Sequence, residues 1–173
     1  MNPLSQDLNV MRQTLMFNAL EAVELNVNRR NANLKMYEAG NCYAYVADQA
    51  SEENTLAKYE ESYRIGITVT GLATQLSWNS KAEGSSYFTL RAAVEKLLKR
   101  FGIDIYTLQC ESLDCDLYAD AIVFKQGAKE VLRMGVVAPA VRKKFDIKQD
   151  VYFAEIDFDQ LVKMTKKSKI QFK

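Results

Sequence analysis

Apolar residues recur at helical spacing in two separate stretches of the chain. In the first stretch, residues 13–30, they stand at i, i+4 and i+7, at Leu15, Met16, Ala19, Leu20, Val23 and Val27. The second stretch follows Ser86, a suitable N-terminal cap, and stops at Gly102, a residue type that often ends helices. Its apolar stripe consists of Leu90, Ala93, Val94, Leu97, Leu98 and Phe101. The spacing therefore predicts two amphipathic helices, one over each stretch.

Alternating and β-branched segments predict strands between and after these helices. Residues 34–46 are rich in aromatic and apolar side chains, and residues 64–71 alternate in β-branched residues. Gln126, Gly127 and Ala128 predict a hairpin turn between two later strands. Loops are expected at residues 47–57 and 77–86. Further strands are expected at residues 8–11, 105–110, 121–125, 130–137 and 151–156, and short helices at residues 139–144 and 158–164.

The order of these elements indicates an α+β fold with a mainly antiparallel sheet and flanking helices. The chain has 173 residues and shows neither an internal repeat nor a Pro/Gly-rich linker, which fits a single domain over residues 1–173. The N-terminal residues do not resemble a signal peptide, and no apolar run has the length of a membrane span. We therefore expect no association with a membrane.

Composition narrows the chemistry that the chain can perform. It contains no histidine, which excludes Ser-His-Asp and Cys-His nucleophile arrangements and metal sites with histidine ligands. Its three cysteines are scattered and odd in number, which favours free thiols in a reducing, cytoplasmic compartment. The formal net charge of +1 argues against a strong, unspecific grip on nucleic acid.

Three carboxylates alternate around the end of the last predicted strand, at Glu155, Asp157 and Asp159. Carboxylate oxygens at this spacing could hold a divalent cation. A solvated strand face followed by a helix cap explains them more simply, so we expect no metal site and no cofactor in this chain.

Three arginines flank the first predicted helix, namely Arg12 before it and Arg29 and Arg30 at its end. They could contact RNA phosphates or a protein partner. Salt bridges and a solvated helix end explain them more simply, because arginines at helix ends commonly serve those roles.

Four motifs, in order along the chain, give the sequence a family resemblance. Two residues within these motifs, Thr89 and Ala138, stand where the family named below usually has an aspartate and a histidine. The motifs are NPLS at residues 2–5 with VMR at 10–12 and NVNR at 26–29, MYEAG at 36–40, YFTLR at 87–91, and GVVAP at 135–139 followed by FDI at 145–147. Together they resemble the synthetase-like core of the bacterial phenylalanyl-tRNA synthetase beta-subunit family, which has the class II aminoacyl-tRNA synthetase fold.

The resemblance also implies which residues have been lost. The third class II motif places two glycines and an arginine where this chain has Glu155, Asp157 and Gln160, and the second motif places an arginine after Gly40, where this chain has none before Arg64. A phosphate site needs bare backbone N–H groups and a fixed cation. A carboxylate about 4 Å from a phosphate costs on the order of 4 kcal/mol at a partly exposed site. We therefore expect these positions to bind no ATP.

What the resemblance implies is a non-catalytic core domain from a longer beta subunit. In that family a separate alpha subunit binds ATP and phenylalanine, and the complex uses ATP and Mg²⁺ to attach phenylalanine to tRNA. The expected partners are this alpha subunit and, in the full complex, tRNA. We also expect an exposed apolar patch where the alpha subunit or a flanking helix would pack. The alternative is a free-standing RNA- or protein-binding module without synthetase activity.

Overall fold

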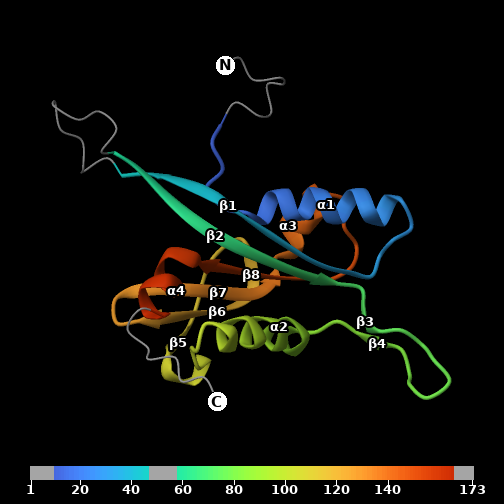
Figure 1. The fold of residues 1–173 in the computed structure, drawn as a ribbon. Coiled ribbons are helices and arrows are strands. Elements are labelled where there is room, and N and C mark those ends of the chain that lie inside the picture. The colour runs from blue at the N-terminus through green and yellow to red at the C-terminus, as the bar shows by residue number, and fades with distance from the viewer. Residues whose placement is uncertain (1–9, 47–57, 166–173) are drawn as a thin grey trace.

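A six-stranded antiparallel sheet forms the centre of the computed structural model, which describes residues 10–46 and 58–165 (Figure 1). Its strand order is β1-β2-β8-β7-β6-β5. The strands are β1 (Leu34–Tyr45), β2 (Tyr59–Thr70), β5 (Gln109–Ser112), β6 (Tyr118–Gln126), β7 (Lys129–Val137) and β8 (Val151–Asp157). The predicted α+β fold with a mainly antiparallel sheet is confirmed.

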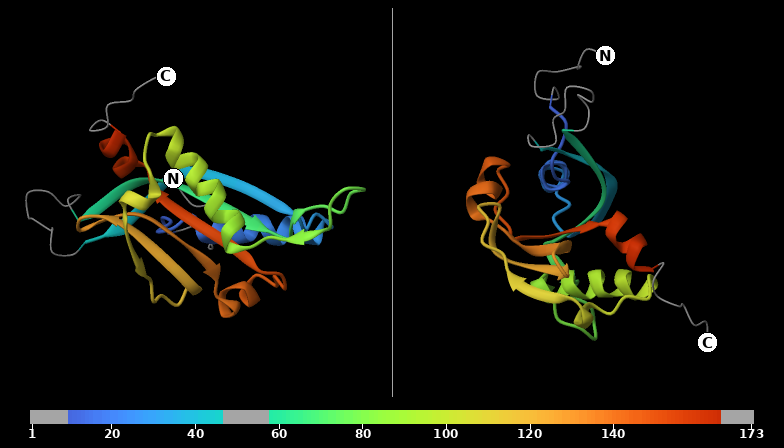
Figure 2. Two further views of the ribbon diagram at one scale, coloured as in Figure 1. Left: turned by 90° about the horizontal axis from the view of Figure 1, so that it is seen from below. Right: turned by 90° about the vertical axis from the view of Figure 1, so that its left-hand side faces the viewer.

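Helices cover both faces of this sheet (Figure 2). Helices α1 (Met16–Asn28) and α3 (Pro139–Lys144) pack on one face, which we call the α1 face. Helices α2 (Tyr87–Arg100) and α4 (Phe158–Thr165) pack on the other, the α2 face. Each face carries its own hydrophobic core, so the sheet is the middle layer of three.

Strand β8 joins the two cores because it lies between β2 and β7 near the middle of the sheet. Successive side chains of a strand point to opposite faces. Val151 and Phe153 accordingly enter the α1-face core, whereas Ala154 and Ile156 enter the α2-face core. Helix α4 begins immediately at the end of β8, so the predicted strand-to-helix junction is confirmed.

Both long helices predicted from apolar spacing are present. The Ser86 side chain accepts a hydrogen bond from the Thr89 backbone N–H, and the Thr89 hydroxyl accepts one from the Ser86 backbone N–H. This capping box fixes the start of α2 where the sequence placed it. Helix α1 has no side-chain cap at its own N-cap residue, Leu15.

Three local expectations need correction. The strand expected at residues 105–110 is a 3-10 turn (Ile105–Thr107) followed by β5, because Asp104 accepts from the Tyr106 N–H and closes the turn. The loop expected at residues 77–86 lies within a hairpin of β3 (Leu72–Thr74) and β4 (Glu83–Gly84). Val10 and Met11 are not in a strand. Residues 8 and 9, the loop at 47–57 and the tail from 166 lie outside the described residues.

Among the described residues, no helix combines the length and the apolar character that crossing a bilayer requires.

Candidate functional site

The junction between β8 and α4 carries the three motif-related residues, with Glu155 and Asp157 on β8 and Gln160 on α4. Alternation along β8 places Glu155 on the same face as Val151 and Phe153. Asp157 ends the strand, and its Oδ1 accepts a hydrogen bond from the Gln160 backbone N–H at 2.9 Å. A helix cap was expected among the three carboxylates, and Asp157 is the one with this role at the start of α4; it also supplies the negative charge that a helix N-terminus favours.

Glu155 is buried, so its assignment to a solvated strand face is wrong. Its Oε1 accepts hydrogen bonds from the Thr14 hydroxyl and the Leu15 backbone N–H, both at 2.8 Å. Its Oε2 accepts from Arg64 Nη1, also at 2.8 Å. A carboxylate is tolerated at such a position because donors and an opposite charge replace the water that it loses.

Glu155 therefore performs two structural tasks at once. Leu15 is the N-cap residue of α1 and offers no side-chain cap of its own, so the Glu155 carboxylate from β8 satisfies the free N–H at this helix end. It also fixes α1 to the centre of the sheet across 140 residues of sequence.

Arg64 is the first arginine after Gly40 in the sequence, and its guanidinium is bound by other side chains of the protein. It lies on β2 opposite Asp157 in the strand register, and its Nε donates to the Ser62 hydroxyl at 3.0 Å. Its Nη1 is engaged with Glu155. A guanidinium held in this way is a fixed cation whose charge is already balanced.

The space beside this ion pair is small and mixed in charge. A cavity of about 100 Å³ is lined by two arginines and three carboxylates, namely Arg64, Arg133, Glu130, Glu155 and Asp157. Arg133 Nε donates to Glu130 Oε1 at 2.6 Å, so the second arginine is also paired. Pockets for cofactor-sized ligands usually measure roughly 300–1,000 Å³. The cavity is smaller than such pockets, and both of its arginines are paired with carboxylates.

Burial affects the pKa values of two side chains near this site. Burial raises the pKa of the Tyr118 hydroxyl above its usual range, and the negative charge of Glu155 adds to the effect. Burial also raises the pKa of the Cys42 thiol, again with a smaller contribution from Glu155. Cys42 therefore has the character of an inert core thiol and not of a nucleophile.

The other predicted site residues are separate from this junction. Arg12 donates from Nε to the Asn41 carbonyl at 2.8 Å and pairs with Glu38, so it has the salt-bridge role that explained it most simply. It lies directly over Gly40, where a Cβ atom would collide with its guanidinium. Arg29 and Arg30 are exposed at the C-terminal end of α1, about 20 Å along the helix from Leu15.

Within residues 10–46 and 58–165, no group of three or more histidine, cysteine or carboxylate side chains could hold a metal ion. Asp159, the third carboxylate of the strand end, instead accepts a hydrogen bond from the Tyr63 backbone N–H at 3.2 Å.

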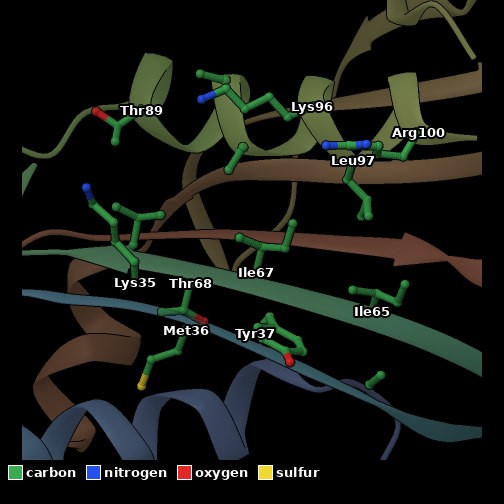
Figure 3. Close-up of a pocket in the computed structure, with 14 residues that line it drawn as sticks. Lys35, Met36, Tyr37, Ile65, Ile67, Thr68, Thr89, Lys96, Leu97 and Arg100 are labelled. Atoms are coloured by element: carbon green, nitrogen blue, oxygen red, sulfur yellow. The ribbon is translucent and has the colours of Figure 1, made fainter.

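A larger feature lies on the α2 face, where a groove of about 760 Å³ runs between α2 and strands β1 and β2 (Figure 3). Ile65, Ile67 and Leu97 are among its apolar walls. Residues 35, 37 and 39 of β1, which point to this face, are all exposed, whereas Leu34, Gly40 and Cys42 on the opposite face of the strand are buried. One face of β1 is therefore covered by α1 and the other is bare.

The edge of the groove is basic. Lys35, Lys96 and Arg100 line it, and no carboxylate from residues 10–46 or 58–165 does. The expected apolar patch is thus present, although the sequence assigned two of its residues, Ala93 and Leu97, to the core stripe of the second helix. The predicted stripe was wider than the part of α2 that the core covers, since only Leu90, Val94 and Leu98 of this helix are fully buried. That extra width was the sequence signal that could have indicated an exposed apolar patch.

Comparisons with known proteins agree with this architecture. Residues 1–158 match the family model described as phenylalanyl tRNA synthetase beta chain CLM domain. The chain is 44% identical over 174 residues to the phenylalanine–tRNA ligase beta subunit of Bacteroides thetaiotaomicron, and 40% identical over 172 residues to that of Porphyromonas gingivalis. These alignments cover 100% and 99% of the chain but 21% of each relative, so the chain spans about a fifth of their length.

Among solved structures, the chain resembles the pyrrolysyl-tRNA synthetase of Desulfitobacterium hafniense. The TM-score is 0.62 at 15% sequence identity, over 91% of this chain and 50% of that one. At this identity the likeness concerns the fold, which is that of a class II synthetase core.

Proposed function

We propose that this chain, which belongs to the phenylalanyl tRNA synthetase beta chain CLM domain family, is a non-catalytic synthetase-like core that supports assembly of a phenylalanine–tRNA ligase with its catalytic alpha subunit. In this proposal the alpha subunit binds ATP, Mg²⁺ and phenylalanine. The present chain contributes a folded scaffold and surfaces for its partner.

The ion pair between Arg64 and Glu155 is the observation that carries this proposal. Adenylate chemistry depends on positive groups placed around phosphates before the reaction starts. Here a buried carboxylate pairs with Arg64, and the adjacent cavity of about 100 Å³ is lined by three carboxylates and by two arginines that are both already paired. The residues that replace the motif glycines are therefore parts of the fold, because they hold α1 and α4 in place.

The groove on the α2 face supports the assembly role. An exposed apolar surface of this kind is uncommon on proteins that act alone, and it commonly marks a contact with another protein segment. Its basic edge of Lys35, Lys96 and Arg100 would favour a segment with carboxylates beside its apolar face.

Calorimetric titration with ATP and Mg²⁺ tests the non-catalytic part of the proposal. The chain is expected to show no binding at millimolar ATP, whereas the alpha subunit, titrated in parallel, is expected to bind. Micromolar affinity of this chain for ATP would contradict the proposal.

Co-purification with a tagged alpha subunit tests the assembly part. The wild-type chain is expected to be retained. Ala93→Trp, which fills the groove, is expected to weaken retention at least tenfold, whereas Glu21→Trp on the exposed face of α1 serves as the matched control. Absence of retention for the wild-type chain would contradict the assembly role and favour the alternative, a free-standing binding module. A gel shift with tRNA at physiological salt would then test whether that module binds RNA.

A further inference from the structure

A hairpin arm projects from the sheet beside the N-terminal end of α2 (Figures 1 and 2). It consists of β3, β4 and the turn between them, residues 72–84. Every residue from Thr74 to Asn79 and from Lys81 to Gly84 is exposed, so the arm contributes nothing to either hydrophobic core. Ordering a segment costs conformational entropy, and core packing does not offset that cost here, so the arm is expected to have another role.

Trp78, the only tryptophan of the chain, lies in the turn of this arm and is 97% exposed. Leu76 beside it is 76% exposed. An indole buries roughly 150–250 Å² when it is covered, which makes tryptophan the side chain with most to gain from a partner. The arm therefore exposes two large apolar side chains, two positions apart in the sequence.

The base of the arm is fastened to the sheet. Lys35 Nζ donates to the Ala73 carbonyl at 2.9 Å, and the Leu72 N–H donates to Asn33 Oδ1 at 2.8 Å. The Ser85 N–H donates to the Gly71 carbonyl, also at 2.8 Å. These bonds come from both sides of the hairpin, so they set the direction in which it projects.

The turn that carries Trp78 is also held in one shape. The Ser77 N–H donates to the Ser80 carbonyl at 3.0 Å. The Ser77 hydroxyl donates to Asn79 Oδ1 at 2.6 Å and lies 2.8 Å from the Ser80 hydroxyl. Presentation of a rigid aromatic anchor lowers the entropy lost on binding, and such anchors supply most of the energy of protein interfaces.

The charges on the arm favour a protein over RNA as the partner. Its charged side chains, Lys81 and Glu83, are of opposite sign. Sites that stack nucleic-acid bases combine aromatic rings with a positively charged groove. An arm without net charge that presents an indole and a leucine suits an apolar pocket on a protein surface.

We infer that Trp78 is an anchor that inserts into an apolar pocket of the catalytic alpha subunit, and this inference rests on the function proposed above. The arm carries the indole away from the sheet, where a second folded subunit can receive it without disturbing either core. Leu76 packs at the edge of the same contact.

The sole tryptophan permits a direct test. The full chain labelled with 5-fluorotryptophan gives one ¹⁹F resonance, which is recorded alone, with unlabelled alpha subunit and with tRNA. The dissociation constant for the alpha subunit is measured in parallel for the wild-type chain, Trp78→Ala and Phe88→Ala. Phe88 is a suitable control because it is 74% exposed and lies outside the arm.

The inference predicts that the alpha subunit shifts the resonance and shields the indole from a soluble quencher. Trp78→Ala is expected to weaken binding at least tenfold, and Phe88→Ala less than threefold. Wild-type affinity of Trp78→Ala would overturn this inference alone and leave the proposed assembly intact. A resonance shift with tRNA but not with the alpha subunit would overturn it in favour of RNA. Failure of the wild-type chain to bind the alpha subunit would overturn the proposed function, and this inference with it.

Discussion

Arg64 Nη1 lies 2.8 Å from Glu155 Oε2, and the Glu155 side chain is only 2% exposed. The two residues lie on adjacent strands, 91 positions apart in the sequence. The pair neutralises the charge of Arg64 within the protein. It also joins β2 and β8 to the start of α1, because Glu155 accepts from Thr14 and Leu15 as well.

Glu155→Gln is expected to lower the free energy of unfolding by about 2–3 kcal/mol. Removal of one partner from a buried ion pair leaves the other charge without compensation, and the effect is reduced here because Arg64 is 24% exposed. Urea unfolding at neutral pH measures the change. Glu95→Gln, which breaks the surface pair with Arg91 on α2, is the control and should cost at most about 0.5 kcal/mol. Equal effects of the two substitutions would contradict the role given to Glu155.

Asp157→Ala is expected to destabilise the protein by about 1 kcal/mol, since it removes the side chain that accepts from the Gln160 N–H at the start of α4. Asp157→Asn retains an equivalent acceptor and should lie within a few tenths of a kcal/mol of wild type. Thermal or urea unfolding distinguishes the two variants. A large loss in Asp157→Asn would mean that the charge, and not the cap, is what matters.

Gly135→Ala is expected to destabilise the protein by about 2–3 kcal/mol. A Cβ atom at this position on β7 would meet the Asp120 carbonyl oxygen and would lie 2.7 Å from the Ala121 Cα atom, and backbone atoms cannot move aside cheaply. Gly84→Ala is the matched control, because a Cβ atom there has nothing within 4 Å, and it should change stability by less than about 0.5 kcal/mol. Comparable unfolding midpoints for the two variants would argue against the close approach of β6 and β7.

Tyr118→Phe is expected to change the response of the protein to alkaline pH. Burial raises the pKa of Tyr118 in the folded state above the ordinary value of 10.0. The folded form therefore retains a proton that the unfolded chain releases, so stability is complete below pH 10 and falls as the pH rises above it. The difference in unfolding free energy between Tyr118→Phe and wild type should move in favour of the variant by up to about 1.4 kcal/mol per pH unit above pH 10.

Urea unfolding of both proteins from pH 8 to pH 11 measures this difference. The values between pH 8 and pH 9 provide the baseline, where the difference should stay constant. A difference that remains constant up to pH 11 would contradict the raised pKa, because it would mean that a hydrogen-bond donor, a cation or water stabilises the Tyr118 phenolate in the folded state.

The sequence was a good guide wherever neighbouring residues decide the structure. Helix α2 begins at Ser86 because Ser86 and Thr89 cap each other, and both residues stand within one turn. A helix cap was expected among Glu155, Asp157 and Asp159, and the structure shows that Asp157 has this role, three positions from Gln160. The order of the four motifs sufficed to indicate the family, to which the chain does belong.

The same reasoning failed for Glu155. Alternation in β8 shows that residues 151, 153 and 155 share a face, yet it does not show what lies opposite that face. A carboxylate at one of these positions is expected to face solvent unless its hydrogen-bonding partners are known. The partners of Glu155 are Thr14, Leu15 and Arg64, which lie outside β8 and far away in the sequence. The projecting arm was likewise missed, because a short hairpin with polar residues has the composition of a loop.

By itself, then, the sequence determined the α+β class, the presence of both long helices and the start of α2 at Ser86. Only the tertiary structure decided that Glu155 is buried against Arg64, that Arg12 is held by Glu38, and that β1 is bare on its α2 face. The physical reason is that local patterns depend on residues a few positions apart. Burial and ion pairing instead depend on strand register and on which helix covers each face, and these bring together residues more than 90 positions apart.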